Sequence, residues 1–269
     1  PIGLRNGVSS ISTGQYHTCV RLAEGGVRCW GGNLAGALGD GTTFESWEPI
    51  EPRDLGNVAA VVAGGLNTCA ITQAGGVKCW GLNTHGQVGD GTFVSRLVPT
   101  DTLASEAVTA IDLAGAAVCA VTNGGRLYCW GDNLEGQLGA NATARRLTPV
   151  EATPSGDPTS RVAPGGSHTC AVTSAGRVRC WGYNREGQVG DGTSFHRLEP
   201  VDVGLEARQV GVVAGVAHTC SLSAEGSVAC WGSNPSGQLG DGTLVDRNAP
   251  TPASQAGTGF VALAAGNSH

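Results

Sequence analysis

At 269 residues the chain is long enough for one large domain or two ordinary ones, and its 40% apolar content suffices for a packed core. No stretch approaches the roughly 20 apolar residues of a membrane-spanning helix, so we expect no membrane insertion. The formal charge of -6 is spread over interspersed acidic and basic residues, which argues against the clustered basic face of a nucleic-acid-binding protein.

Methionine is absent, whereas glycine and proline are frequent, with 44 and 12 copies. A chain without methionine is expected to be a processed form or a segment of a longer protein. The many glycines and prolines indicate frequent turns between short elements.

Cysteine spacing divides the chain into repeats. The ten cysteines form five pairs whose members lie ten residues apart, and the pairs recur about every 50 residues. A fixed period of this length suits a four-stranded blade of a β-propeller. We therefore predict an all-β single repeat domain over 1–269, with five complete repeats and partial ones at both ends. The repeats are expected near 8–57, 58–107, 108–158, 159–208 and 209–257, with a partial copy at 258–269.

Each repeat is predicted to contain four antiparallel strands. In the second copy these are 57–63, 68–72, 76–80 and a region near 97–100. Alternating β-branched and small residues, with Gly, Asn or Pro at each break, favour strands over helices.

Glycine positions predict how the cysteines pair. A three-residue hairpin loop favours glycine in third place, and Gly75 occupies that place in the second copy. Centring the hairpin there sets Cys69 opposite Cys79 in a non-hydrogen-bonded pair, where Cα atoms approach within about 4.5 Å. That separation suits a disulfide. The five predicted disulfides are Cys19–Cys29, Cys69–Cys79, Cys119–Cys129, Cys170–Cys180 and Cys220–Cys230.

Zinc binding is the competing interpretation of these cysteines. Zinc sites usually hold cysteines two to four residues apart, and this chain has no such pair. Disulfides in turn predict an oxidising compartment, and so a secreted or cell-surface protein.

Three further residue types recur once per repeat. The tryptophan after each second cysteine is predicted to pack between blades rather than to stack on a ligand. A histidine at 17, 168, 218 and 269 could form a metal ring, but Asn67 and Ala117 replace it in two copies. We therefore expect these histidines to cap turns. The Asp-Gly-Thr corners, together with an asparagine seven residues earlier, are predicted to be turns rather than calcium loops.

The repeat also resembles a known family. Cys-Trp-Gly-Leu-Asn at 79–83 and Gly-Gln-Val-Gly-Asp-Gly-Thr at 86–92 are similar to the regulator of chromosome condensation repeat, and the second string recurs at 187–193. The resemblance covers nearly the whole chain and implies a propeller, usually of seven blades. Among members of that family, a secreted bacterial β-lactamase inhibitor matches the predicted compartment better than a nuclear exchange factor or a plant photoreceptor does.

The chain ends inside a repeat. Ala265 to His269 matches Ala214 to His218, and the next residues of the pattern would be threonine and cysteine. Both ends therefore contain a first strand. This predicts either a segment of a larger propeller or a subunit whose spare strand completes a neighbouring blade.

Binding residues are expected where the copies disagree. The loop after each Asp-Gly-Thr corner varies most, and it offers the aromatic and arginine residues that anchor interfaces. The candidates are Phe44, Trp47, Phe93, Arg145, Arg146, Phe195 and His196. These side chains could equally pack under their own loops.

Motifs for catalysis are missing: the sequence contains no Gly-x-Ser-x-Gly elbow, no phosphate loop and no His-Glu-x-x-His. We predict a non-enzymatic extracellular interaction scaffold without metal or cofactor, which binds a protein partner or self-assembles through its incomplete terminal blades. The alternatives are a secreted inhibitor of an extracellular enzyme, and a propeller hydrolase or lectin with a site in the central channel.

Overall fold

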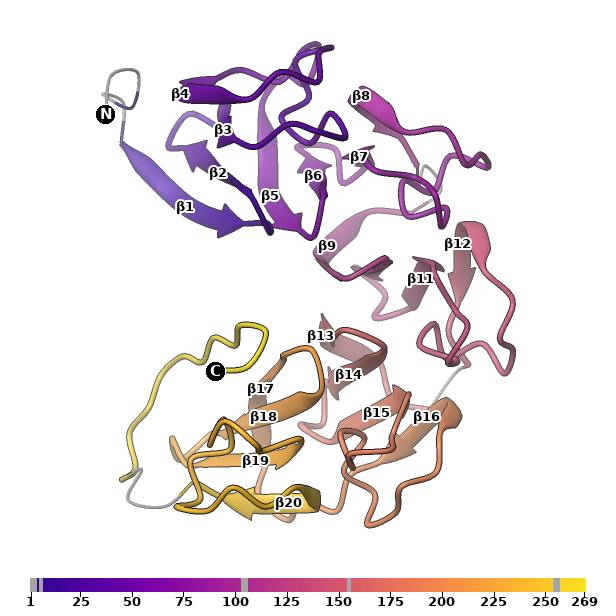
Figure 1. Cartoon of the computed structure of the whole chain (residues 1–269), viewed down its shortest axis with the longest axis vertical. Helices are drawn as coiled ribbons and strands as arrows, with labels where there is room; N and C mark the ends of the chain where they lie inside the picture. Colours follow the sequence, from indigo (N-terminus) through magenta and orange to yellow (C-terminus); the bar gives the residue numbers. More distant parts are fainter. Residues whose placement is uncertain (1–3, 5–6, 103–105, 154–155, 254–256) are drawn as a thin grey trace. The chain divides into compact units, whose positions relative to one another are not determined.

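The computed structural model describes residues 4, 7–102, 106–153, 156–253 and 257–269. These residues form five antiparallel sheets of four strands each, and no helix occurs among them (Figure 1). The predicted all-β fold of four-stranded blades is therefore confirmed.

The strands follow one another in chain order through the blades. Blade 1 comprises β1 (Val8–Thr13), β2 (His17–Leu22), β3 (Val27–Gly31) and β4 (Ser46–Ile50). Blade 2 comprises β5 (Val58–Gly64), β6 (Asn67–Thr72), β7 (Val77–Gly81) and β8 (Arg96–Asp101). Blade 3 comprises β9 (Val108–Ala114), β10 (Ala117–Thr122), β11 (Leu127–Gly131) and β12 (Arg146–Glu151). Blade 4 comprises β13 (Thr159–Pro164), β14 (His168–Thr173), β15 (Val178–Gly182) and β16 (Arg197–Asp202). Blade 5 comprises β17 (Gln209–Ala214), β18 (His218–Ser223), β19 (Val228–Gly232) and β20 (Arg247–Pro252).

The chain divides into two compact units, each considered by itself. Unit 1 comprises Pro1–Asn123, Trp130–Asp132 and Arg145–Pro149, and unit 2 comprises Gly124–Cys129, Asn133–Ala144 and Val150–His269. Blades 1 and 2 lie in unit 1 and blades 4 and 5 in unit 2, whereas the residues of blade 3 are divided between them.

In blade 2, each strand starts within one residue of its predicted position.

The hairpin between the second and third strands has the predicted loop. Gly75 adopts a φ of 84°, and the closing pair Thr72 and Gly76 is hydrogen-bonded. Cys69 faces Cys79 across the ladder, and their Cα atoms are 4.1 Å apart in a disulfide. The same bond forms in blades 1, 4 and 5, and Cys119 and Cys129 are disulfide-bonded as well. The disulfide prediction is confirmed.

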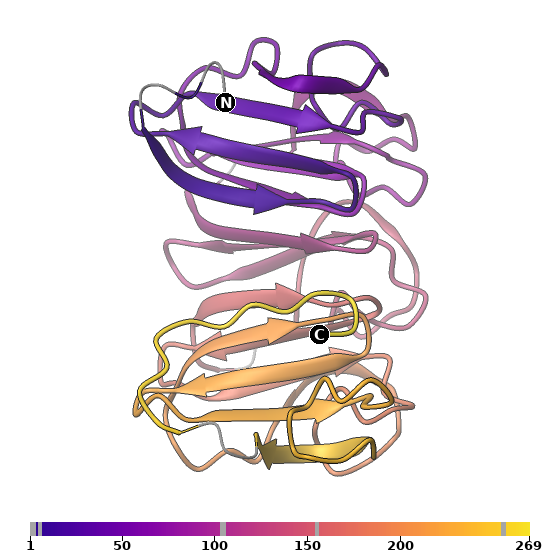
Figure 2. The same cartoon turned by 60° about the vertical axis from the view of Figure 1, so that its left-hand side comes forward.

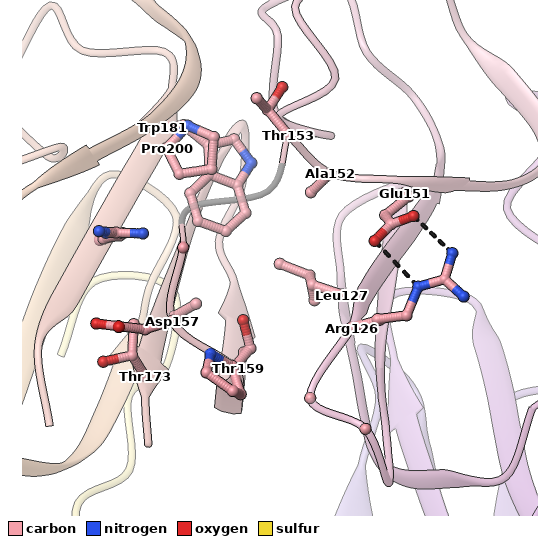
Figure 3. A pocket seen from close by; sticks show the side chains of 16 residues that line it. Arg126, Leu127, Glu151, Ala152, Thr153, Asp157, Thr159, Thr173, Trp181 and Pro200 are labelled. Carbon is pink, nitrogen blue, oxygen red and sulfur yellow. Dashed lines mark hydrogen bonds and ion pairs between the residues drawn. The ribbon is translucent and has the colours of Figure 1, made fainter. Parts of the chain in front are cut away.

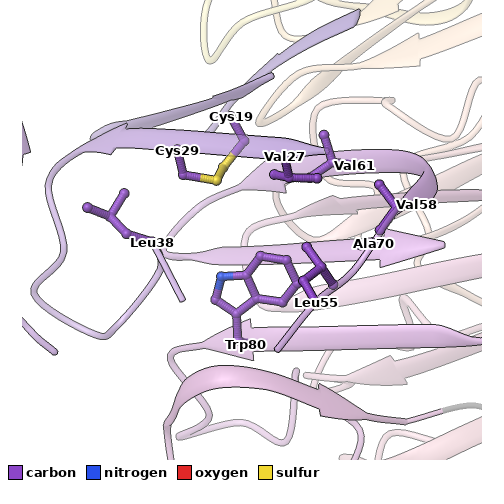
Figure 4. Close-up of a cluster of buried hydrophobic side chains, with 9 residues drawn as sticks. All are labelled: Cys19, Val27, Cys29, Leu38, Leu55, Val58, Val61, Ala70 and Trp80. Atoms are coloured by element: carbon purple, nitrogen blue, oxygen red, sulfur yellow. A yellow bond between two sulfur atoms is a disulfide. The ribbon is translucent and has the colours of Figure 1, made fainter. Parts of the chain in front are cut away.

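Tryptophan forms the joint between consecutive blades. Trp80 of blade 2 is fully buried against blade 1, in a cluster that includes Leu38 and the Cys19–Cys29 disulfide (Figure 4). Its indole Nε1 donates a hydrogen bond of 2.8 Å to the carbonyl of Ala37. A Cβ on Gly39 would lie 2.7 Å from that nitrogen, so only glycine lets the indole approach so closely.

The same joint recurs along the chain. Each later indole donates to the carbonyl of a glutamine in the preceding blade: Trp130 to Gln87, Trp181 to Gln137 and Trp231 to Gln188. These tryptophans are fully buried, which confirms the predicted packing between blades. Trp30 differs, because it belongs to the first blade and stays partly exposed.

Candidate functional site

A buried asparagine organises the corner that follows the third strand. In blade 2, the Nδ2 of Asn83 donates to Asp90 Oδ1 at 3.2 Å and to the carbonyls of Thr92 and Val94 at 2.9 and 3.0 Å. Its Oδ1 accepts the N–H of Val88 at 2.9 Å. One side chain thus satisfies four groups of an irregular loop. A loop with so many internal hydrogen bonds is held in one conformation.

The aspartate of the corner also accepts several hydrogen bonds. Asp90 accepts the N–H and the hydroxyl of Thr92 at 3.0 and 2.8 Å, and Arg96 Nε donates to its other oxygen at 2.5 Å. Burial acts to raise the pKa of Asp90, but the hydrogen bonds from Thr92 and Arg96 outweigh it and lower the pKa overall. The carboxylate is a turn residue, as predicted.

Four corners share this arrangement, and the third departs from it. The asparagine and aspartate recur together as Asn33–Asp40, Asn184–Asp191 and Asn234–Asp241. Arg197 and Arg247 take the role of Arg96, whereas blade 1 has Ser46 at that position. The third copy has Ala140 in place of the aspartate. Among the described residues, the buried Nε of Arg146 in that copy has no hydrogen-bond partner.

The corners of unit 1 present apolar side chains to solvent. Phe44 is 79% exposed, and Leu34, Phe93 and Val94 are also exposed; we call these four residues the unit 1 corner patch. Beside Phe44 lies a hollow of about 620 Å³ whose walls include Tyr16, Leu34 and Leu66. The patch therefore combines a protruding aromatic side chain with an adjoining recess.

The corners of unit 2 do the same. Phe195 on the corner of blade 4 is 74% exposed, and Leu134, Leu244 and Val245 on the corners of blades 3 and 5 are also exposed; we use the name unit 2 corner patch for these four residues. These aromatic residues do not pack under their own loops. They protrude from loops whose backbone is fixed by the asparagine and aspartate hydrogen bonds.

The other predicted binding residues lie in different surroundings. Trp47 is exposed on β4. Arg145 forms an ion pair with Asp132, at 2.9 Å. His196 contacts the ring of Tyr183 and the carboxylate of Glu135, so it joins two loops of unit 2. The structure therefore brings Phe44 and Phe93 onto corner loops of unit 1 and Phe195 onto one of unit 2. Arg145 and His196 are held in local contacts, whereas the buried Nε of Arg146 has no hydrogen-bond partner among the described residues.

Two residues of these patches, Leu34 and Leu134, were not predicted from the sequence. Leu34 and Leu134 follow the buried asparagine directly, at a position where the other copies have Thr84, Arg185 and Pro235. The copies disagree there as well, so the criterion applied to the later loop would also have selected this position.

The recurring histidines do not cap turns, which corrects the sequence-based interpretation. His17 Nε2 lies 2.8 Å from Thr68 Oγ1 in the next blade, and His168 pairs with Thr219 at the same distance. Both histidines are buried. They are therefore part of the joint between blades, and in the described part of the chain no group of three His, Cys, Asp or Glu residues could hold a metal ion.

Unit 2 also contains a small hollow of about 230 Å³ between blades 3 and 4 (Figure 3). Arg126 forms two hydrogen bonds, of 3.1 and 2.7 Å, with Glu151 on its wall. The hydrogen bond from Arg126 holds the pKa of Glu151 below its usual range. Asp157 is paired with Arg177. Glu151, with its pKa lowered in this way, stays ionised at neutral pH and is therefore not suited to act as a general acid.

None of the described segments forms a helix that could traverse a lipid bilayer.

Comparison with known proteins gives a consistent family. A family model described as RCC1-like domain matches residues 2–269. Human WBSCR16 has a similar structure, with a TM-score of 0.86 and 26% identity over 96% of this chain and 70% of that chain. Yeast RCC1 (Prp20), in a crystal structure with Kap60, gives a TM-score of 0.82 and 21% identity over 97% of this chain and 66% of that chain.

A third similar structure comes from a receptor. The CRINKLY WD40 ectodomain of the Arabidopsis thaliana receptor kinase ACR4 gives a TM-score of 0.60 and 19% identity, covering 97% of this chain and 72% of that chain. No curated protein matches the sequence.

Proposed function

Because the chain belongs to the RCC1-like domain family, we propose that it is a non-enzymatic scaffold that binds a protein partner outside the cell. The observation that carries this proposal is the exposure of Phe44 and Phe195 on rigid corner loops. Leu34 and Phe44 are both exposed and line the same hollow; exposed apolar side chains that lie together mark interaction sites, and aromatic side chains are preferred anchors of such sites. A loop that is already ordered loses little entropy when it binds.

An extracellular location is supported by the disulfides, which persist in oxidising compartments. The resemblance to the ACR4 ectodomain agrees with it. The cysteine pairs further support a secreted bacterial member of the family.

The absence of an enzymatic activity is part of the same proposal. RCC1-like propellers generally act by binding. The carboxylates of the unit 2 hollow are held in ion pairs, which offers no support for a hydrolase there.

A peptide library displayed on phage tests this function without a known partner. Selection on the oxidised protein is expected to recover peptides with apolar or aromatic anchors. Phe44→Ser or Phe195→Ser should raise the dissociation constant of these peptides at least about tenfold. An aromatic anchor that is buried on binding contributes about 2 kcal/mol or more, and about 1.4 kcal/mol corresponds to a factor of ten. Val216→Ser, which changes an exposed apolar residue outside both corner patches, is the matched control. Peptides that bind all three variants and the parent equally would refute the proposal.

The exposed aromatic residues also support a narrower version, in which the partner is an extracellular enzyme that the protein inhibits. Inhibition requires a surface that is ordered before binding, and the corner loops provide one.

A further inference from the structure

The hollow beside Phe44 combines two aromatic side chains with a carboxylate. Its walls include Tyr16, Leu34, Phe44 and Glu45 from blade 1 and Leu66 from blade 2. In the antiparallel sheet of blade 1, β1 and β3 end at the same edge (Figure 2). The turn that holds Tyr16 therefore lies beside the corner loop. The hollow is a mostly apolar recess with one carboxylate on its wall.

The exposure of the apolar walls is a property of the repeat. Val94 and Phe195 occupy the position of Phe44 in blades 2 and 4, and they are 60% and 74% exposed. Leu134 occupies the position of Leu34 in blade 3 and is 58% exposed. Each of these three blades is preceded and followed by another blade in the chain. The exposure of Leu34 and Phe44 therefore does not depend on the place of blade 1 in the sequence.

Glu45 occupies a repeat position that the other corners use for internal contacts. Ser95 and Asp246 accept the N–H of the asparagine in their own corners, at 3.2 and 2.6 Å. Arg145 and His196 form the ion pairs described above. In blade 1 the side chain at this position lines the hollow instead. Its carboxylate is thus placed where a bound molecule can reach it.

The carboxylate of Glu45 also has no cation beside it. It accepts a hydrogen bond of 3.3 Å from the indole Nε1 of Trp47, and it forms no ion pair within the described part of the chain. Asp101, another exposed carboxylate of unit 1, is paired with Lys78 at 2.8 Å. A carboxylate and the faces of aromatic rings both attract positive charge. The walls of the hollow therefore favour a cationic occupant with apolar parts.

We propose that the hollow accepts an arginine side chain of the protein partner. The guanidinium donates hydrogen bonds to Glu45 and stacks on an aromatic wall, two contacts that its planar shape allows at once. The apolar stem of the arginine contacts Leu34 and Leu66. The net charge of -6 favours the approach of a cationic segment. This inference names the chemistry of the partner and rests on the proposed function, because it uses the patch that contains Phe44.

Size and desolvation support the same occupant. The volume of about 620 Å³ lies within the range of about 300–1,000 Å³ that is usual for pockets that hold small ligands. It has room for an arginine side chain and part of its flanking residues. A purely apolar occupant would remove water from the carboxylate of Glu45 and leave it without a partner, which costs free energy.

Selection from one peptide library displayed on phage tests this proposal with two matched variants. Glu45→Gln removes the charge and keeps the size of the side chain. Glu48→Gln makes the same change at an exposed residue of β4 outside the hollow. Arginine should be enriched among peptides selected on the oxidised parent and on Glu48→Gln, and this enrichment should be lost on Glu45→Gln. No enrichment on the parent, or equal enrichment on all three proteins, would overturn the proposal.

Isothermal titration calorimetry with one enriched peptide gives the second measurement. Citrulline has the shape of arginine without its charge. Exchanging arginine for citrulline should raise the dissociation constant for the parent at least about fivefold and leave that for Glu45→Gln nearly unchanged. If Phe44→Ser weakens binding but citrulline binds the parent as well as arginine does, this inference fails and the proposed function stands. A library that yields no binding peptide contradicts both.

Discussion

The histidines of the blade joints have a defined proton position. Thr68 Oγ1 donates its proton to the carbonyl of Ala37, at 2.8 Å, because a carbonyl can only accept. The hydroxyl must therefore accept from His17, which carries its proton on Nε2. The Nδ1 of His17 is buried without a hydrogen-bond partner among the described residues. A Cβ on Gly14 would lie 2.5 Å from this nitrogen, so the joint requires glycine beside histidine.

Acid is expected to destabilise the protein through these joints. Burial lowers the pKa of His17 to about 4, with a partial opposing effect of a hydrogen bond at Asn67, and burial together with the charge of His218 lowers the pKa of His168 to about 3. Between pH 6.5 and 4 the unfolded chain binds protons that the folded chain does not. The contribution of these histidines to the free energy of unfolding is therefore complete above pH 6.5. Below pH 6.5 the free energy of unfolding falls by about 1.4 kcal/mol per pH unit for each histidine.

Urea unfolding across this pH range, with the His17→Asn variant, checks the assignment. Asparagine occupies this position in blade 2 as Asn67, so the fold accepts it. The variant should lose about one histidine's share of the slope. An unchanged slope would mean that His17 is not buried as a neutral group.

The corner of blade 1 can be completed. Asp40 binds Thr42 and Asn33 but lacks the arginine found in blades 2, 4 and 5. Ser46→Arg should supply it and raise the free energy of unfolding by about 0.5–1 kcal/mol, the usual value of a partly exposed ion pair. Ser46→Gln, which adds length without charge, should give no such gain. Equal effects of both variants in denaturant titrations would contradict the proposed pairing.

At the scale of the hairpin, each disulfide is expected to act alone. Cys69 and Cys79 close a loop of ten residues, and such a short loop stabilises by about 2–3 kcal/mol. Replacing both with alanine should lower the free energy of unfolding by about that amount. Reducing the parent protein should lower its free energy of unfolding further, because the reductant opens every disulfide. Thermal unfolding with and without reductant measures both effects. A double variant as stable as the parent would show that the bridge makes no contribution.

The tryptophan joint provides a comparison within one chain. Trp80→Ala removes a fully buried indole and its hydrogen bond to Ala37, a loss of about 3–5 kcal/mol for such a side chain. Trp30→Ala removes the same side chain from a partly exposed position and should cost clearly less. Denaturant unfolding at low protein concentration compares the two. Equal costs would contradict the joint described here.

The hairpins could be predicted because their determinants are local. Gly75 sets the loop, and the ten-residue spacing then decides that Cys69 faces Cys79. The partner of His17 could not be predicted in this way, because Thr68 lies 51 residues away and only the stacking of two blades brings them together. The exposure of Phe44 also depends on the hydrogen bonds of Asn33, which the sequence indicated only as a turn residue.

At the scale of the whole molecule, the repeat explains both stability and the proposed binding. Positions where the copies agree form hairpins, joints and corners, and positions where they differ form the exposed patches of each unit. That all repeats form a single domain over 1–269 stays a prediction.

A disulfide within each blade implies that the protein folds in an oxidising compartment. Disulfide mapping of the protein from its native source, with thiols blocked at the moment of lysis, tests this pairing. We predict that each cysteine is linked to the one ten residues away in the same blade, as Cys69 is to Cys79, and that no free thiol is detected. Free thiols, or bridges between cysteines of different blades, would contradict both the compartment and the proposed extracellular role.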